Sequence, residues 1–179
     1  ITLLGSDPET VEAGTTYTDA GATATDNADG DLTASINTTN PVNTSLVGTY
    51  LVLYEVSDSA GLTGIANRTV YVNDTTAPTI TVLGDNPAAV ELNDVYADAG
   101  ATAVDTLDGD LTDDIIPDTS AVDTSTEGTY TVTYDVTDSE GNAATTATRD
   151  VVVADTINPS IDTTTLVIDP SATVNQNDT

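Results

Sequence analysis

The residues best suited to chemistry in this chain are acidic, and they lie in two loops that share the pattern D-x-x-D-G-D-L-T. The pattern occupies residues 26–33 and returns at residues 105–112. In each copy a glycine precedes the last aspartate and allows a sharp turn, so the flanking carboxylates converge. Neighbouring carboxylates repel by about 1 kcal/mol per pair even in water, and a bound cation reverses that sign. Ca²⁺ suits such a loop because it accepts about six to eight oxygen ligands in loose geometry, whereas Mg²⁺ requires a tighter octahedron.

The candidate metal ligands, with Ca²⁺ as the expected cofactor, come from three places in the sequence. They are the two loops (Asp26, Asp29, Asp31, Asp105, Asp108, Asp110), two aspartates that each begin Asp-Ser-x-Gly (Asp58, Asp138), and two aspartates between repeats (Asp74, Asp155). An alternative stays open, because aspartate is also typical of turns, in which its carboxylate accepts hydrogen bonds from backbone amides. For Asp58 and Asp138 taken alone, turn formation is the favoured interpretation.

The elements that must position these loops are short strands. In residues 50–56 and 130–136, Tyr and Val occupy alternate positions, which places them on one face of a strand. Other short runs rich in Thr and Val are bounded by Gly, Pro, Asn and Asp, and they occur at residues 1–4, 17–25, 69–72, 80–83, 96–104 and 150–153. The sequence therefore predicts an all-β fold made of antiparallel β-sandwiches.

Internal recurrence sets the domain organisation. The segment Ile-Thr-Leu-Leu-Gly at residues 1–5 matches Ile-Thr-Val-Leu-Gly at residues 80–84, and Gly-Thr-Tyr occurs at residues 48–50 and 128–130. We expect one module at residues 1–74, a second at 75–155, and a linker with the N-terminal part of a third repeat at 156–179. The linkers are short and contain proline, which limits the freedom between modules.

The chain resembles a known family through two segments. They are Val-Glu-x-Gly-x-x-Tyr-x-Asp-x-Gly-Ala-x-Ala-x-Asp-x-x-Asp-Gly-Asp-Leu-Thr at residues 11–33 and Gly-Thr-Tyr-x-Val-x-Tyr-x-Val-x-Asp-Ser-x-Gly from residue 48. Both are similar to the bacterial immunoglobulin-like (Ig-like, HYR-like) tandem repeats of large surface adhesins and secreted multidomain proteins. The resemblance implies two tandem Ig-like antiparallel β-sandwiches plus the start of a third repeat, in an extracellular, cell-surface array that often depends on calcium.

The Ig-like topology makes a prediction about the joint between modules. Loops after the second and sixth strands lie at the end of the sandwich that receives the incoming linker. Asp105, Asp108 and Asp110 should therefore lie close to Asp138 and to Asp74 of the linker. By the same argument, Asp155 would meet the corresponding loop of a third module.

Composition excludes several classes of function. Thirty acidic residues stand against two basic ones, Arg68 and Arg149, which gives a formal charge of −28. Such a field disfavours nucleic acid and anionic membranes as partners, and no segment has the length of a membrane span. Without Cys there are no disulfides. The acidity has a second interpretation, adaptation to a saline medium.

Two further sets of residues are assigned to structure. Arg68 and Arg149 occupy equivalent positions, and each is expected to form an ion pair with a nearby acid. The tyrosines that alternate with valine are expected in the core: Tyr50, Tyr54, Tyr130 and Tyr134. Since no segment indicates a substrate pocket, we expect no enzymatic activity.

The leading functional hypothesis is a structural or adhesive stalk of a repetitive surface protein, rigidified by calcium at module junctions. Its partners would be neighbouring Ig-like repeats. One alternative is a subunit of an extracellular filament or surface layer, in which the strand-like tail at residues 163–168 completes the sheet of a neighbouring copy. Another is a carbohydrate-binding accessory module of a secreted enzyme.

Overall fold

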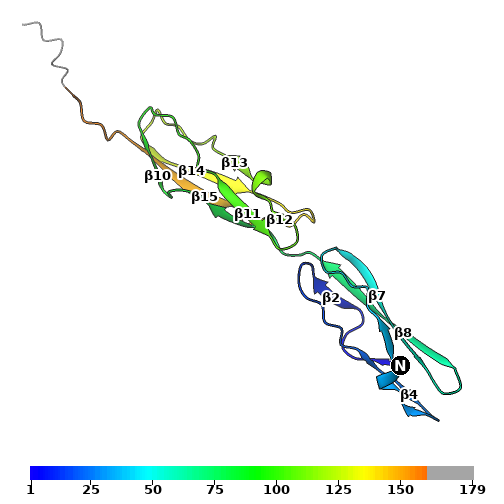
Figure 1. Cartoon of the computed structure of the whole chain (residues 1–179). Helices are drawn as coiled ribbons and strands as arrows, with labels where there is room; N and C mark the ends of the chain where they lie inside the picture. The colour runs from blue at the N-terminus through cyan, green and yellow to red at the C-terminus, as the bar shows by residue number, and fades with distance from the viewer. Residues whose placement is uncertain (161–179) are drawn as a thin grey trace, which may run out of the picture.

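The computed structural model describes residues 1–160 and shows two β-sandwiches joined end to end in a rod (Figure 1). Module 1 contains strands β1 to β8, and module 2 contains β9 to β15. The all-β, Ig-like prediction is confirmed. The expected tail strand at residues 163–168 lies outside the described residues, as does most of the expected third repeat.

Module 1 is built around a four-stranded sheet in the order β2-β8-β7-β6. Its strands are β2 (Glu9–Glu12), β8 (Thr63–Asn73), β7 (Gly48–Ser57) and β6 (Asn37–Thr39). Two short pairs accompany it: β1 (Thr2–Leu3) with β3 (Ala22–Thr23), and β4 (Thr25–Asp26) with β5 (Gly30–Asp31). A 3₁₀ turn, η1 (Thr33–Ser35), leads into β6.

Module 2 repeats this plan with a more continuous second sheet. The four-stranded sheet runs β10 (Ala88–Glu91), β15 (Ala147–Ala154), β14 (Gly128–Asp135) and β13 (Ile116–Asp118). The other sheet runs β12 (Gly109–Asp110), β11 (Ala101–Asp105) and β9 (Thr79–Val82), and η2 (Thr112–Asp114) precedes β13. The second copy of the acidic pattern thus begins at the end of β11 and forms the turn of the β11–β12 hairpin.

The alternating residues of the long central strands form the two cores. Val52 and Tyr54 in β7, and Val132 and Tyr134 in β14, are fully buried. The residues between them face outward, which is the expected result of a period-two pattern. Tyr50 and Tyr130 are half-buried, and their hydroxyls donate to the carbonyls of Leu46 and Thr126.

Two details of the strand prediction were wrong. The strands β2 and β10 pair in parallel with β8 and β15, so the sheets are not purely antiparallel. The predicted strands at residues 17–25 and 96–104 begin only at Ala22 and Ala101. Asp98 accepts a hydrogen bond from the Gly100 amide at 3.2 Å, and Gly100 has φ +77°, so the chain turns there instead of extending.

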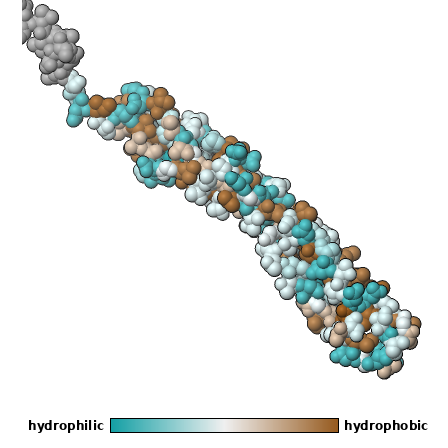
Figure 2. Space-filling model, in the orientation of Figure 1, coloured by the Kyte–Doolittle hydropathy of each residue, from teal (hydrophilic) through white to brown (hydrophobic). Residues whose placement is uncertain are grey.

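The surface of the rod is mixed. On the face shown in Figure 2, hydrophobic residues are scattered among hydrophilic ones along the whole length. Within residues 1–160, no helix has the length and apolar character needed to cross a membrane.

Candidate metal centre

The linker aspartate is fixed where module 1 ends. Asp74 directly follows β8, and the Asn73 carbonyl accepts a hydrogen bond from the Ala13 amide at 2.7 Å. The Glu12 carboxylate accepts hydrogen bonds from the Thr75 amide at 2.8 Å and from the Thr75 and Thr76 hydroxyls at 2.7 Å. These hydrogen bonds lower the pKa of Glu12 to about 2, and the bond from the Thr75 amide contributes most. Module 1 therefore holds its own exit segment through an ionised glutamate.

Module 2 presents two aspartates to this linker, each at the start of a turn. Asp105 ends β11, and its Oδ1 accepts the amides of Leu107 at 2.7 Å and Asp108 at 3.0 Å. Asp138 follows the β14 segment, and its carboxylate accepts the Asn142 amide at 2.7 Å and the Asn142 side-chain amide at 2.8 Å. The same carboxylates can therefore form turns and converge on the linker, because the hydrogen bonds within each turn fix the orientation of the Asp105 and Asp138 side chains.

Asp74, Asp105 and Asp138 form what we call the inner group. One carboxylate oxygen from each lies within 4.8 Å of the others, and the three residues are 8%, 5% and 7% exposed. The Oδ2 atoms of Asp74 and Asp105 are buried and have no hydrogen-bond partner among the described residues. A buried, unsatisfied carboxylate oxygen is costly. Both Oδ2 atoms are therefore available to accept a ligand.

The charges of the inner group affect one another. Burial, followed by the negative charges of Asp105 and Asp138, raises the pKa of Asp74 above its ordinary value. Burial acts in the same direction on Asp138, but the hydrogen bonds from Asn142 outweigh it and lower the pKa of Asp138. Asn142 also donates to the Asp74 carbonyl at 3.3 Å, so it links the module 2 turn to the linker.

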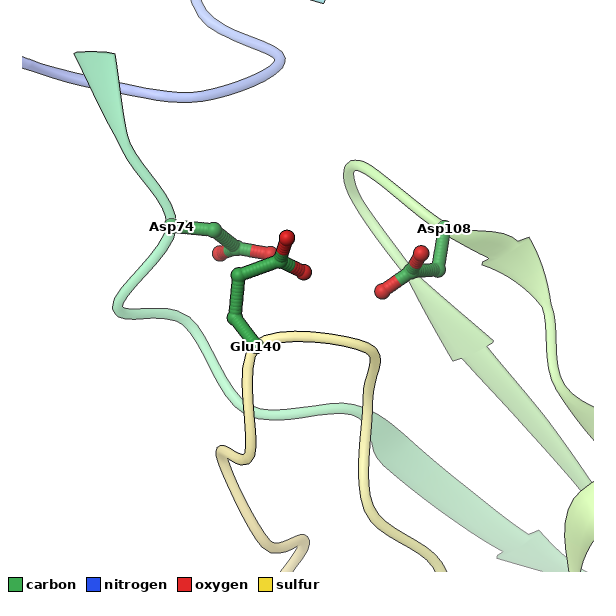
Figure 3. A group of neighbouring side chains, drawn as sticks. All are labelled: Asp74, Asp108 and Glu140. Atoms are coloured by element: carbon green, nitrogen blue, oxygen red, sulfur yellow. The ribbon is translucent and has the colours of Figure 1, made fainter. Parts of the chain in front are cut away.

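A second cluster, the outer group, shares Asp74 with the first and adds Asp108 and Glu140. Figure 3 shows the three side chains converging from the linker, the β11–β12 hairpin and the loop after β14. Their ligand atoms also lie within 4.8 Å of one another. Ser139 connects two of them, since its hydroxyl donates to Asp108 Oδ1 at 2.9 Å and contacts Glu140 Oε2.

The chain supplies no side-chain cation to this joint. Its only two basic residues are Arg68 and Arg149, and both are buried in the module cores. Arg68 pairs with Asp19 at 2.8 Å, and Arg149 pairs with Asp98. The predicted structural role of the arginines is confirmed, and the carboxylates of the joint are left without a basic partner.

The other predicted ligands are engaged in turns. Asp31 and Asp110 each accept the amide two residues ahead, from Thr33 and Thr112, and Asp110 belongs to neither group at the joint. Three more of them lie at the far end of module 1. Asp26 accepts the Ala28 and Asp29 amides, and Asp29 accepts the Ser59 amide. Asp58 accepts the Ala60 and Leu62 amides. Asp155 is exposed and accepts the Ile157 amide. Within residues 1–160 these aspartates form no three-carboxylate group.

Sequence reasoning missed Glu140, Asn142 and Glu12. The first two occupy positions where module 1 has Ala60 and Leu62, so they are absent from the recurring pattern. The difference between the copies was itself the available signal, because it falls in the loop that faces the linker. Glu12 does recur as Glu91, which accepts the Thr156 amide and hydroxyl in the same way.

Together, the fold and the joint define a tandem array of Ig-like sandwiches with an acidic junction. The family model described as bacterial surface protein, Ig-like domain, matches residues 1–72 and again 80–153. The chain belongs to this family, and its repeats are the family's domain.

The chain spans less than a fifth of the length of the curated relatives it matches. The chain is 38% identical over 132 residues to the pesticidal crystal protein Cry22Aa of Bacillus thuringiensis. This match covers 72% of this chain and 18% of that protein. It is 28% identical over 176 residues to the serine-rich adhesin for platelets of Staphylococcus aureus, covering 87% of this chain and 8% of the adhesin. Among solved structures, the fibronectin(III)-like modules of Clostridium thermocellum CbhA share 19% identity with a TM-score of 0.31, covering 83% of this chain and 90% of that one.

Proposed function

We propose that this chain is a non-catalytic stalk segment of an extracellular surface protein, in which Ca²⁺ bound by the inner group fixes the joint between the two modules. The observation that carries the proposal is the pair of buried, unpartnered Oδ2 atoms of Asp74 and Asp105 beside Asp138. A cation at this point would satisfy both atoms and reverse the repulsion among the carboxylates.

Calcium is the ion that fits this chemistry best. The donors are carboxylate oxygens, with no His or Cys anywhere in the chain. The loops around them are turns whose carbonyls and bound water can supply further oxygen ligands, as the larger and less regular coordination of Ca²⁺ requires. Strictly octahedral Mg²⁺ gains less from such a site.

The mechanical consequence follows from where the ligands originate. Asp74 belongs to the exit of module 1, whereas Asp105 and Asp138 belong to two loops of module 2. A shared ion therefore cross-links the modules at a point already restricted by the Glu12 bonds to the linker. The result is a stiff rod that separates whatever lies at its two ends, with neighbouring repeats of the same protein as its direct partners.

The test compares calcium, magnesium and chelator by thermal melting and small-angle X-ray scattering. In wild type, calcium should raise Tm and shift the distribution of distances within the molecule to that of a straight rod, and magnesium should do so weakly. The Asp105→Asn variant should lose most of this response, since it removes a charge from the inner group. The matched control is Asp110→Asn, in the same hairpin but outside both groups, which should respond like wild type.

Identical melting curves and scattering profiles in calcium and chelator would refute the proposal. Size-exclusion chromatography with light scattering on the same samples should show a monomer. Calcium-dependent polymerisation would instead favour the filament hypothesis.

A further inference from the structure

The inner and outer groups together carry more negative charge than a single divalent ion can offset. The two groups contain five carboxylates, those of Asp74, Asp105, Asp108, Asp138 and Glu140. One divalent cation would leave three formal negative charges at a junction to which the chain contributes no Lys or Arg. Crowded like charges at the contact between two modules would push the modules apart.

The geometry of the outer group is already that of a ligand set. Asp74 is 92% buried, its Oδ2 has no partner in the described part of the chain, and Figure 3 shows its carboxylate directed towards Glu140 and Asp108. The Ser139 amide donates to Asp108 Oδ2 at 3.1 Å, and the Ser139 hydroxyl contacts both other carboxylates. Each carboxylate oxygen has two lone pairs, so these bonds leave capacity for a metal.

We infer that the outer group binds a second Ca²⁺, with Asp74 as a bridging ligand between the two ions. The inference rests on the proposed calcium site at the inner group. Because Glu140 is exposed and Asp108 half-buried, water competes for the outer ion more effectively than for the inner one. Binding is therefore expected in two steps, with the inner ion tighter.

The outer site is specific to the loop that faces the linker. Module 1 has Ala60 at the position of Glu140, while Asp29 and Ser59 reproduce the contact between Asp108 and Ser139. The hairpin and serine are thus shared by both modules, and the glutamate is the addition that creates a third ligand. This difference supplies a natural substitution for the test.

The experiment is calcium titration by isothermal calorimetry at physiological ionic strength, with circular dichroism in chelator to verify the fold of each variant. Wild type should bind two ions in distinguishable steps. Glu140→Ala, which copies module 1, should keep the tight step and weaken the second by more than about tenfold, because ligand charge sets calcium affinity. Asp105→Asn should weaken the tight step, and Asp110→Asn should bind like wild type.

The outcomes separate the two proposals. A single ion in wild type, or two ions with unchanged affinities in Glu140→Ala, would overturn the second site and leave the inner site standing. No binding in wild type, or an unchanged tight step in Asp105→Asn, would overturn the inner site and the outer site with it.

Discussion

At the scale of single residues, each module depends on one buried arginine. Arg149 is 1% exposed, its Nη1 donates to Asp98, its Nη2 donates to the Gly100 carbonyl at 3.1 Å, and its guanidinium lies 5.8 Å from the centre of the Tyr134 ring. The Tyr134 hydroxyl also donates to Asp98, at 2.7 Å. Both basic residues of the chain lie inside the module cores, so the carboxylates of the joint can be neutralised only by cations from solution.

This arrangement predicts a strong effect of Asp98→Asn on module 2. Loss of the carboxylate leaves a buried arginine without its counter-charge, which costs about 3–5 kcal/mol. Asp150→Asn is the control, because Asp150 is exposed and its carboxylate accepts one weak hydrogen bond, from the Thr131 hydroxyl at 3.3 Å, within residues 1–160. A change within about 0.5 kcal/mol is expected. Denaturant unfolding, followed by tyrosine fluorescence, measures both. Equal midpoints for the two variants would contradict the assignment.

The same carboxylate makes stability depend on pH. Burial acts to raise the pKa of Asp98, but the hydrogen bonds from Tyr134 and Tyr96 and the charge of Arg149 outweigh it and lower that pKa. Because the folded pKa lies below the unfolded value of about 3.9, the stabilisation is complete above that pH and is lost as the pH falls through the folded pKa. Unfolding curves of Asp98→Asn should therefore vary less with pH below about 4 than those of wild type.

At the scale of elements, the turn after β2 determines how closely the modules approach. Gly14 has φ +73°, and a Cβ at this position would lie 2.8 Å from Thr106 Cγ2 and 3.1 Å from the Thr106 carbonyl oxygen in module 2. The equivalent turn of module 2 carries Asn93 with φ 68°. The backbone conformation thus admits Asn, and it is the contact with module 2 that requires glycine.

Gly14→Asn should therefore leave module 1 folded and open the joint. The added side chain displaces Thr106 and with it the neighbouring Asp105, so calcium affinity should fall by about tenfold or more. Calcium titration and scattering measure the change, with Asn93→Gly as the control at the other end of module 2. Wild-type affinity in Gly14→Asn would show that the contact does not determine the distance between the modules.

Sequence alone predicts the elements better than the site. Alternating Tyr and Val identified β7 and β14 because those strands are buried on one face, whereas the four-residue strands β2 and β10 offer too few residues to reveal parallel pairing. Recurrence identified the acidic hairpin, but Asp108 at the joint and Asp110 in a plain turn recur equally. Glu140 does not recur, so recurrence could not find it, and its proximity to Asp74 and Asp108 in the structure assigns it to the site.

At the scale of the whole molecule, the rod has a net charge of −28 and must resist its own repulsion. Two explanations of the acidity make different predictions here. General adaptation to salt acts through screening, which depends on ionic strength and not on ion identity. Specific binding depends on where the carboxylates lie, and five of them surround one junction.

Sodium chloride and calcium should therefore stabilise the chain in separable ways. Raising sodium chloride to about 0.5 M should increase Tm gradually in wild type and in Asp105→Asn alike, because screening acts on the total charge. Calcium added at constant ionic strength should increase Tm further in wild type only, since the ion acts by binding the folded joint and its effect grows with concentration relative to Kd. Differential scanning calorimetry of the two proteins measures both increments. If sodium chloride reproduced the full calcium effect, or if Asp105→Asn retained it, the carboxylates of the joint would be acting as general surface charge.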